Sequence, residues 1–229
     1  MKQVLFFALL LFLAACRDRR EYLQTDLSNH IRFADMAVGQ VSRFVRFEGE
    51  SYYDPNNFNF IYRPDTLVLT VIGADANGFL IEEKLSPGSA SLHGAQYTSD
   101  AAAVFQYYFS VVQDTLFQQA VPGQGAWPQT RLTINAFTLP LAPFSGPEVE
   151  IKGWKPDHLS YDFYLSAIAP DYTLFGIYYP DVNILFDNSA MAADGPGRWC
   201  GYSAASGLIK LAVYSSWTGT GWGWDLLPE

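Results

Sequence analysis

Residues 66–85, TLVLTVIGADANGFLIEEKL, decide the fold. Residues 66–72 are β-branched or apolar, residues 79–85 form a second strand-like run, and the sequence ADANG separates the two. An Asn-Gly pair tolerates the positive φ that a tight hairpin turn requires. The stretch therefore predicts two antiparallel strands joined by a turn at Asn77-Gly78.

The same two-residue alternation continues on both sides of this hairpin. Residues 57–63 place Phe58, Phe60 and Tyr62 on one face of a strand, opposite Asn57, Asn59 and Arg63. Residues 99–120 could instead begin a helix, but their aromatic content favours a strand. Turns are predicted at Pro180-Asp181 and at residues 194–197, and one helical turn at residues 23–33. The further predicted strands are residues 104–112, 131–139, 149–154, 159–168, 172–179, 182–187 and 208–216.

About ten short strands separated by glycine- and proline-containing turns are typical of two architectures. They predict an all-β fold, either an antiparallel β-sandwich or a closed β-barrel, with a lipocalin-like calyx as a variant and at most a short helix. Alternation along single strands is the same in both architectures. No linker, charge run or low-complexity segment divides residues 31–229, so we expect a single β-rich domain.

The N-terminus carries a targeting signal. A lysine at position 2 precedes ten apolar residues, VLFFALLLFL at positions 4–13, which are too few to span a bilayer as a helix. The next residues, Leu13-Ala14-Ala15-Cys16, resemble the lipobox of bacterial lipoproteins. The resemblance implies a signal peptide at residues 1–15, lipid attachment at Cys16 and a lipidated tether at residues 16–30. It also implies a place in the bacterial cell envelope, at the outer membrane, with either a periplasmic or a surface-facing orientation.

Composition excludes several classes of function. The 14 basic and 23 acidic residues give a net charge of −9, which opposes binding to nucleic acid. Two cysteines cannot form a zinc site with four thiolate ligands, and the three histidines lack the close spacing of an H-E-x-x-H helix. Each histidine is interpreted as a surface or hydrogen-bonded residue, so no metal, cofactor or catalytic residue is predicted. Cys200 is interpreted as a small buried hydrophobe. An envelope hydrolase remains an alternative, with the pairs Glu82/Glu83 and Glu148/Glu150 and with His158 as its groups.

The C-terminal run SSWTGTGWGWD at positions 215–225 is unusual because it interleaves three tryptophans with glycines. Exposed rings would suit the faces of sugars or an apolar partner, which makes Tyr214, Trp217, Trp222 and Trp224 the candidate ligand-binding residues. The favoured alternative is that Trp222 and Trp224, two residues apart, point to one side and plug the core.

These observations predict a membrane-anchored envelope lipoprotein with a non-catalytic β-domain. The domain would bind a glycan, a lipid or a protein through aromatic residues, while the lipid at Cys16 would hold it to the membrane. The alternatives are an envelope hydrolase and a structural subunit of an outer-membrane complex.

Overall fold

The computed structural model describes residues 36–50, 59–86, 102–112, 115–125, 130–132, 138–140, 151–152, 155–156, 164–187, 197–203, 206–214 and 220–228. The signal segment, Cys16 and the predicted helical turn at residues 23–33 lie outside these ranges. So do Trp217, Glu148, Glu150 and His158, and large parts of the predicted strands 131–139, 149–154 and 159–168.

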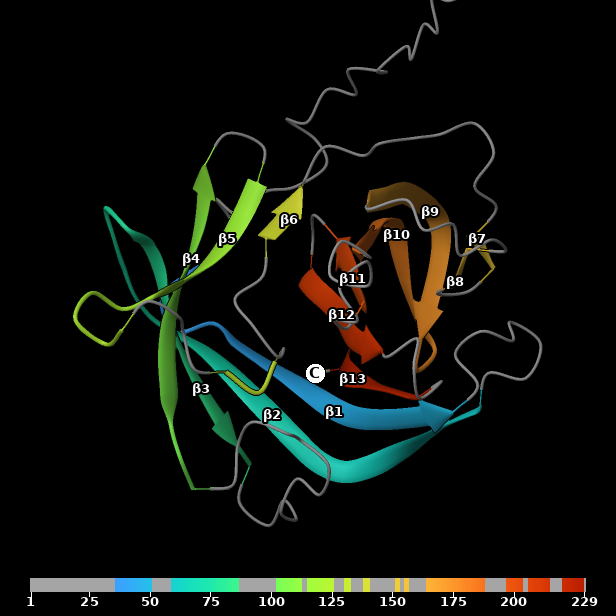
Figure 1. Cartoon of the computed structure of the whole chain (residues 1–229), viewed down its shortest axis with the longest axis horizontal. Helices are drawn as coiled ribbons and strands as arrows, with labels where there is room; N and C mark the ends of the chain where they lie inside the picture. Colours follow the sequence, from blue (N-terminus) through green and yellow to red (C-terminus); the bar gives the residue numbers. More distant parts are fainter. Residues whose placement is uncertain are drawn as a thin grey trace, which may run out of the picture.

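The described residues form strands and their connections, and the prediction of an all-β antiparallel fold is confirmed. The largest sheet has 11 strands in the order β6-β5-β4-β3-β2-β1-β13-β12-β11-β10-β9. It curls strongly on itself into a half-barrel, so that β3–β6 and β9–β12 rise on two sides of β1 and β2 (Figure 1). The strands are β1 (Val41–Glu50), β2 (Asn59–Asp75), β3 (Gly78–Leu85), β4 (Phe105–Val112), β5 (Thr115–Ala120), β6 (Thr138–Pro140), β7 (Ile151–Lys152), β8 (Lys155–Pro156), β9 (Tyr164–Leu174), β10 (Ile177–Asp187), β11 (Gly197–Ser203), β12 (Gly207–Tyr214) and β13 (Thr220–Leu226).

The hairpin predicted from residues 66–85 is present as β2 and β3. Asp75 pairs with Gly78 at its end, and the Asp75 carboxylate accepts a hydrogen bond from the Asn77 backbone N–H at 2.7 Å. Gly78 has a φ of +119°, and a Cβ there would lie 2.3 Å from the Phe109 carbonyl oxygen on β4. Glycine is therefore required at this position both by the turn and by the close approach of the next strand.

The turn predicted at Pro180-Asp181 is wrong. Leu174 pairs with Ile177, so the turn lies at Phe175-Gly176, where φ is +51° and +79°. The strand β10 continues through Pro180. Its described pairing with β11 begins only at Asn183, so at Pro180 the strand is paired on one side, where the missing N–H of proline is tolerated. The predicted strand 172–179 is therefore two strands joined by this turn.

Strands β1, β8, β11 and β13 lie outside the predicted strands. The described part of residues 99–120, for which a strand is favoured over a helix, contains the two strands β4 and β5. The predicted strands 57–63 and 66–72 are parts of one long strand, β2. Strand β1 was not predicted because its apolar residues do not alternate regularly with polar ones: Arg43, Arg46 and Glu48 interrupt the pattern. Arg46 is nevertheless buried, because its guanidinium stacks on tryptophans of β13.

Two buried clusters lie on opposite faces of the central strands. Phe44 belongs to the first cluster and Phe47 to the second, and their odd spacing on β1 points them to opposite faces. The first cluster fills the space between β1–β5 and β11–β13. The second packs β9 and β10 against β1 and β12. Both faces of β1 and β12 are consequently covered by apolar side chains.

Candidate ligand-binding cavity

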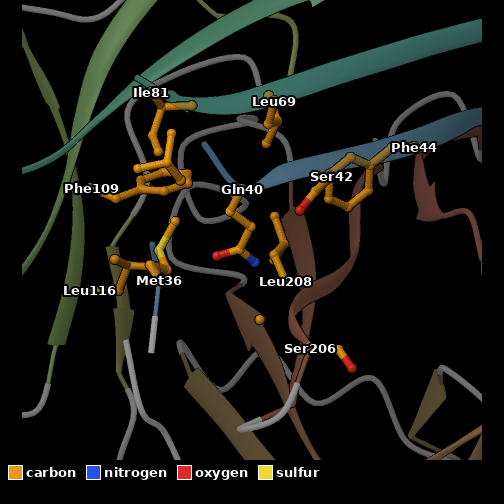
Figure 2. A pocket seen from close by; sticks show the side chains of 12 residues that line it. Met36, Gln40, Ser42, Phe44, Leu69, Ile81, Phe109, Leu116, Ser206 and Leu208 are labelled. Carbon is orange, nitrogen blue, oxygen red and sulfur yellow. The ribbon is translucent and has the colours of Figure 1, made fainter. Parts of the chain in front are cut away.

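A small apolar cavity opens in the first cluster (Figure 2). Its volume is about 40 Å³, enough for a few water molecules or a short apolar group. In Figure 2, Ile81, Leu69 and Phe109 close one side, while Met36 and Leu116 approach from another. The lining comprises Met36, Gln40, Ser42, Phe44, Leu69, Val71, Ile81, Phe109, Leu116, Ser206, Gly207 and Leu208.

The strand register explains why these side chains converge. Leu69 and Val71 lie two residues apart on β2, and Val71 pairs with Ile81 on β3. Residues two apart in a strand share one face, and direct cross-strand partners share it too. Gln40 and Met36 come from the segment before β1, which the hydrogen bond from the Gly39 N–H to the Val71 carbonyl holds against β2 at 2.7 Å.

A larger and more polar cavity adjoins the first one. Its volume is about 340 Å³, and it shares Gln40, Ser42 and Ser206 with the apolar cavity. We refer to the two as the inner and the outer cavity. The outer cavity is lined by Gln40, Val41, Ser42, Arg43, Ile177, Tyr179, Ser206, Leu226, Leu227 and Pro228. These three shared residues are polar and lie at the boundary of both cavities, and we refer to them as the polar junction.

The described lining of the two cavities consists mainly of apolar and neutral polar side chains. Neither cavity's described lining includes a carboxylate, an imidazole or a thiol. Over the described ranges, no group of three or more His, Cys, Asp or Glu side chains could hold a metal ion. Cys200 is buried at 3% exposure within the first cluster, as interpreted from the sequence. What the two cavities offer chemically is hydrophobic contact, hydrogen bonds and one guanidinium.

Glu83, one of the carboxylates considered for a hydrolase, is fully buried and lines neither cavity. It accepts hydrogen bonds from the Tyr107 hydroxyl at 3.1 Å, the Thr130 hydroxyl at 2.5 Å and the Arg131 backbone N–H. Burial raises the pKa of the Glu83 carboxyl, and these hydrogen bonds oppose that effect. The neighbouring Glu82 is only partly buried and pairs with Lys84 at 3.3 Å. Glu82 and Glu83 therefore do not form a catalytic pair.

A second buried ionic group lies on the opposite face. Lys210 Nζ is 2.6 Å from Asp225 Oδ1, and the side chains are 3% and 0% exposed. The Tyr62 hydroxyl donates to Asp225 Oδ2 at 2.8 Å, and the Lys210 ammonium lies 4.1 Å from the centre of the Phe47 ring. Burial lowers the pKa of the Lys210 ammonium, and Asp225 opposes that effect. Burial and the Asp225 charge raise the pKa of the Tyr62 hydroxyl.

The residues predicted as an aromatic site are mostly part of the core. Trp224 and Tyr214 are 0% and 1% exposed, so neither ring can receive a ligand from solvent. The Trp224 Nε1–H donates to the Arg131 carbonyl at 2.8 Å, and Trp222 is half-buried with the Arg46 guanidinium 5.0 Å from its ring centre. The alternative interpretation of the tryptophans as a plug of the core is therefore correct for Trp224.

Exposed aromatic rings gather elsewhere, on β2 and at the turn between β9 and β10. Phe60, Tyr62 and Phe175 are 37%, 39% and 42% exposed. Their ring centres are 5.4 Å apart for Phe60 and Tyr62 and 5.2 Å apart for Tyr62 and Phe175. We call these three residues the exposed ring group. The alternation in residues 57–63 already placed two of them on one face, but nothing local indicated that Phe175 joins them.

Comparisons with known proteins add little to this description. No family model matches the chain, and no curated protein matches it. Among solved structures, a DUF1329 family protein from Desulfovibrio piger is 12% identical over 88% of this chain and 89% of that one. Its TM-score is 0.25, so the likeness carries no argument about fold or function. Over the described part of the chain, no helix is long and apolar enough to cross a membrane.

Proposed function

We propose that this chain is a lipid-anchored protein of the bacterial envelope whose β-domain is non-catalytic and binds a small ligand in the inner and outer cavities. The observation that carries the binding role is the apolar inner cavity of the half-barrel, which shares three polar lining residues with the larger outer cavity. The sequence Leu13-Ala14-Ala15-Cys16 supports the anchor.

The arrangement suits a ligand with an apolar end. Ligand sites are concave and mostly apolar, with a few polar groups that fix orientation. Phe44, Leu69 and Ile81 supply the apolar walls, and Ser42 and Ser206 supply hydroxyls at the junction. Burying a methylene group in such a site contributes about 0.8 kcal/mol.

Binding is tested on the full chain held in phosphatidylcholine nanodiscs. Equilibrium dialysis of labelled octanol, with empty nanodiscs subtracted, measures occupancy. Ser42→Phe places a ring at the junction and should abolish octanol binding, whereas Thr173→Phe, at an exposed position outside both cavities, should not. If neither the unchanged chain nor Thr173→Phe binds octanol above the blank, the cavities are not a ligand site.

The anchor is tested by fractionation. Cys16→Ala should remove the attached lipid and release the protein from membranes, since stable anchoring needs the acyl chains. Cys200→Ala, which alters the buried cysteine, is the matched control and should leave the protein in the membrane fraction. If the Cys16→Ala chain still carries acyl lipid and stays in the membrane fraction, Cys16 is not the site of lipid attachment.

A second candidate role, contact with a glycan, is favoured by the exposed ring group. Flat exposed rings pack well on the apolar faces of sugars. Phe60→Ala and Phe175→Ala should each reduce retention on immobilised envelope glycans, while Ile72→Ala, an exposed apolar residue outside the group, should not. Equal retention by all three variants would exclude the ring group as a glycan site.

A further inference from the structure

We propose that the ligand of the two cavities is an amphiphile with an anionic head, and that the Arg43 guanidinium binds this head. The proposal rests on the proposed ligand-binding function and names the class of ligand. The apolar end would lie in the inner cavity, and the head in the outer one.

The two adjoining cavities differ in the polarity of their linings. The inner cavity is walled by aliphatic and aromatic side chains, whereas the outer one adds Arg43 and Tyr179 to the three shared polar residues. A purely apolar ligand would make no hydrogen bonds with the polar groups of the outer cavity, and a purely polar ligand would leave the apolar inner cavity empty. An amphiphile satisfies both parts.

Arg43 is the one charged residue in the described lining of either cavity. It is exposed on β1, and no carboxylate of the described residues pairs with it. Five other described cations have carboxylates within 4.0 Å: Arg46 and Arg63 with Glu48, Lys84 with Glu82, Arg131 with Glu83, and Lys210 with Asp225. Because no carboxylate among the described residues neutralises it, the Arg43 guanidinium at the outer cavity can attract an anion locally, against the overall net charge of −9.

The volumes set the proportions of the ligand. A water molecule needs about 10–15 Å³ of such space, so the inner cavity of about 40 Å³ holds only the last few carbon atoms of a chain. The outer cavity of about 340 Å³ has room for the rest of the chain and for the head. A short fatty acid such as octanoate is therefore a suitable probe.

The experiment compares octanoate with octanol on the full chain in phosphatidylcholine nanodiscs at pH 7, by equilibrium dialysis. The two probes share a chain and differ in charge. We expect octanoate to bind about tenfold more tightly than octanol, as a charge-assisted contact would provide. Arg43→Gln should weaken octanoate binding about tenfold and change octanol binding less than twofold. Arg63→Gln removes the same charge outside both cavities and should change neither.

The outcomes separate this proposal from the proposed function. If octanol and octanoate bind equally, Ser42→Phe abolishes both and Arg43→Gln alters neither, the cavity binds ligands but the anionic head is refuted. If Arg63→Gln weakens octanoate as much as Arg43→Gln does, the effect is one of net charge, and the specific contact is refuted as well. If neither probe binds, both proposals fail together.

Discussion

Replacing Asp225 with asparagine tests the buried ion pair of the second cluster. Asparagine keeps the size of the side chain and can still accept a hydrogen bond from the Tyr62 hydroxyl, but it removes the carboxylate charge that lies 2.6 Å from the buried Lys210 ammonium. Removing one partner of a buried pair costs about 3–5 kcal/mol. In a chain of this size each kcal/mol lowers the melting temperature by about 2–4 °C, so we expect a fall of about 6–20 °C.

Urea unfolding followed by tryptophan fluorescence measures this loss as a free energy. The matched control is Glu82→Gln, because Glu82 pairs with Lys84 at 3.3 Å but the side chains are 26% and 47% exposed. An exposed pair contributes less than about 1 kcal/mol. Adding Lys210→Met to Asp225→Asn also removes the buried ammonium charge and should restore most of the lost stability. The reasoning is refuted if Asp225→Asn costs no more than Glu82→Gln, or if Lys210→Met restores nothing.

Three further predictions follow from the fold. Gly78→Ala should destabilise the chain by about 1–3 kcal/mol more than Gly39→Ala, because both glycines have positive φ but only a Cβ at position 78 meets backbone; equal urea midpoints would contradict this. Trp224→Phe should cost about 1–3 kcal/mol of unfolding free energy, because it leaves the buried Arg131 carbonyl without its donor; an unchanged value would show that this hydrogen bond does not matter. Burial raises the pKa of the Glu83 carboxyl above 4.5, so between 4.5 and the raised value the folded chain holds more protons than the unfolded one. Stability should therefore fall as the pH rises through that window. The urea midpoint of Glu83→Gln should change less with pH than that of the unchanged chain. If both midpoints change with pH in the same way, Glu83 is not the cause.

The hairpin of β2 and β3 could be predicted because its determinants are local. Alternating side chains and the turn residues Asn77-Gly78 lie within one short stretch. Strand β1 could not be predicted in this way. Its Arg46 is buried through stacking on Trp222 and Trp224, which lie far along the chain and reach it only through the pairing of β1 with β13.

The inner cavity could not be predicted either, because it also depends on contacts between residues that lie far apart in the chain. Its walls come from β1, β2, β3, β4, β5 and β12, and no single strand carries a pattern that marks it. The tryptophan-rich run drew attention because of its composition, yet the sheet buries Trp224 and instead exposes Phe175. That exposure depends on a turn in which a phenylalanine adopts a φ of +51°, a conformation usually taken by glycine or asparagine.

The open edges of the large sheet have a mechanical consequence. In a closed barrel every strand is hydrogen-bonded on both sides, so widening the interior breaks backbone hydrogen bonds. Here β6 and β9 end the order of strands, and no described hydrogen bond joins them. A change in the curvature of the sheet therefore breaks no backbone hydrogen bond among the described strands. We therefore expect that a bound ligand can widen the inner cavity through the curvature of the sheet, so that its volume of about 40 Å³ does not fix the upper limit on ligand size.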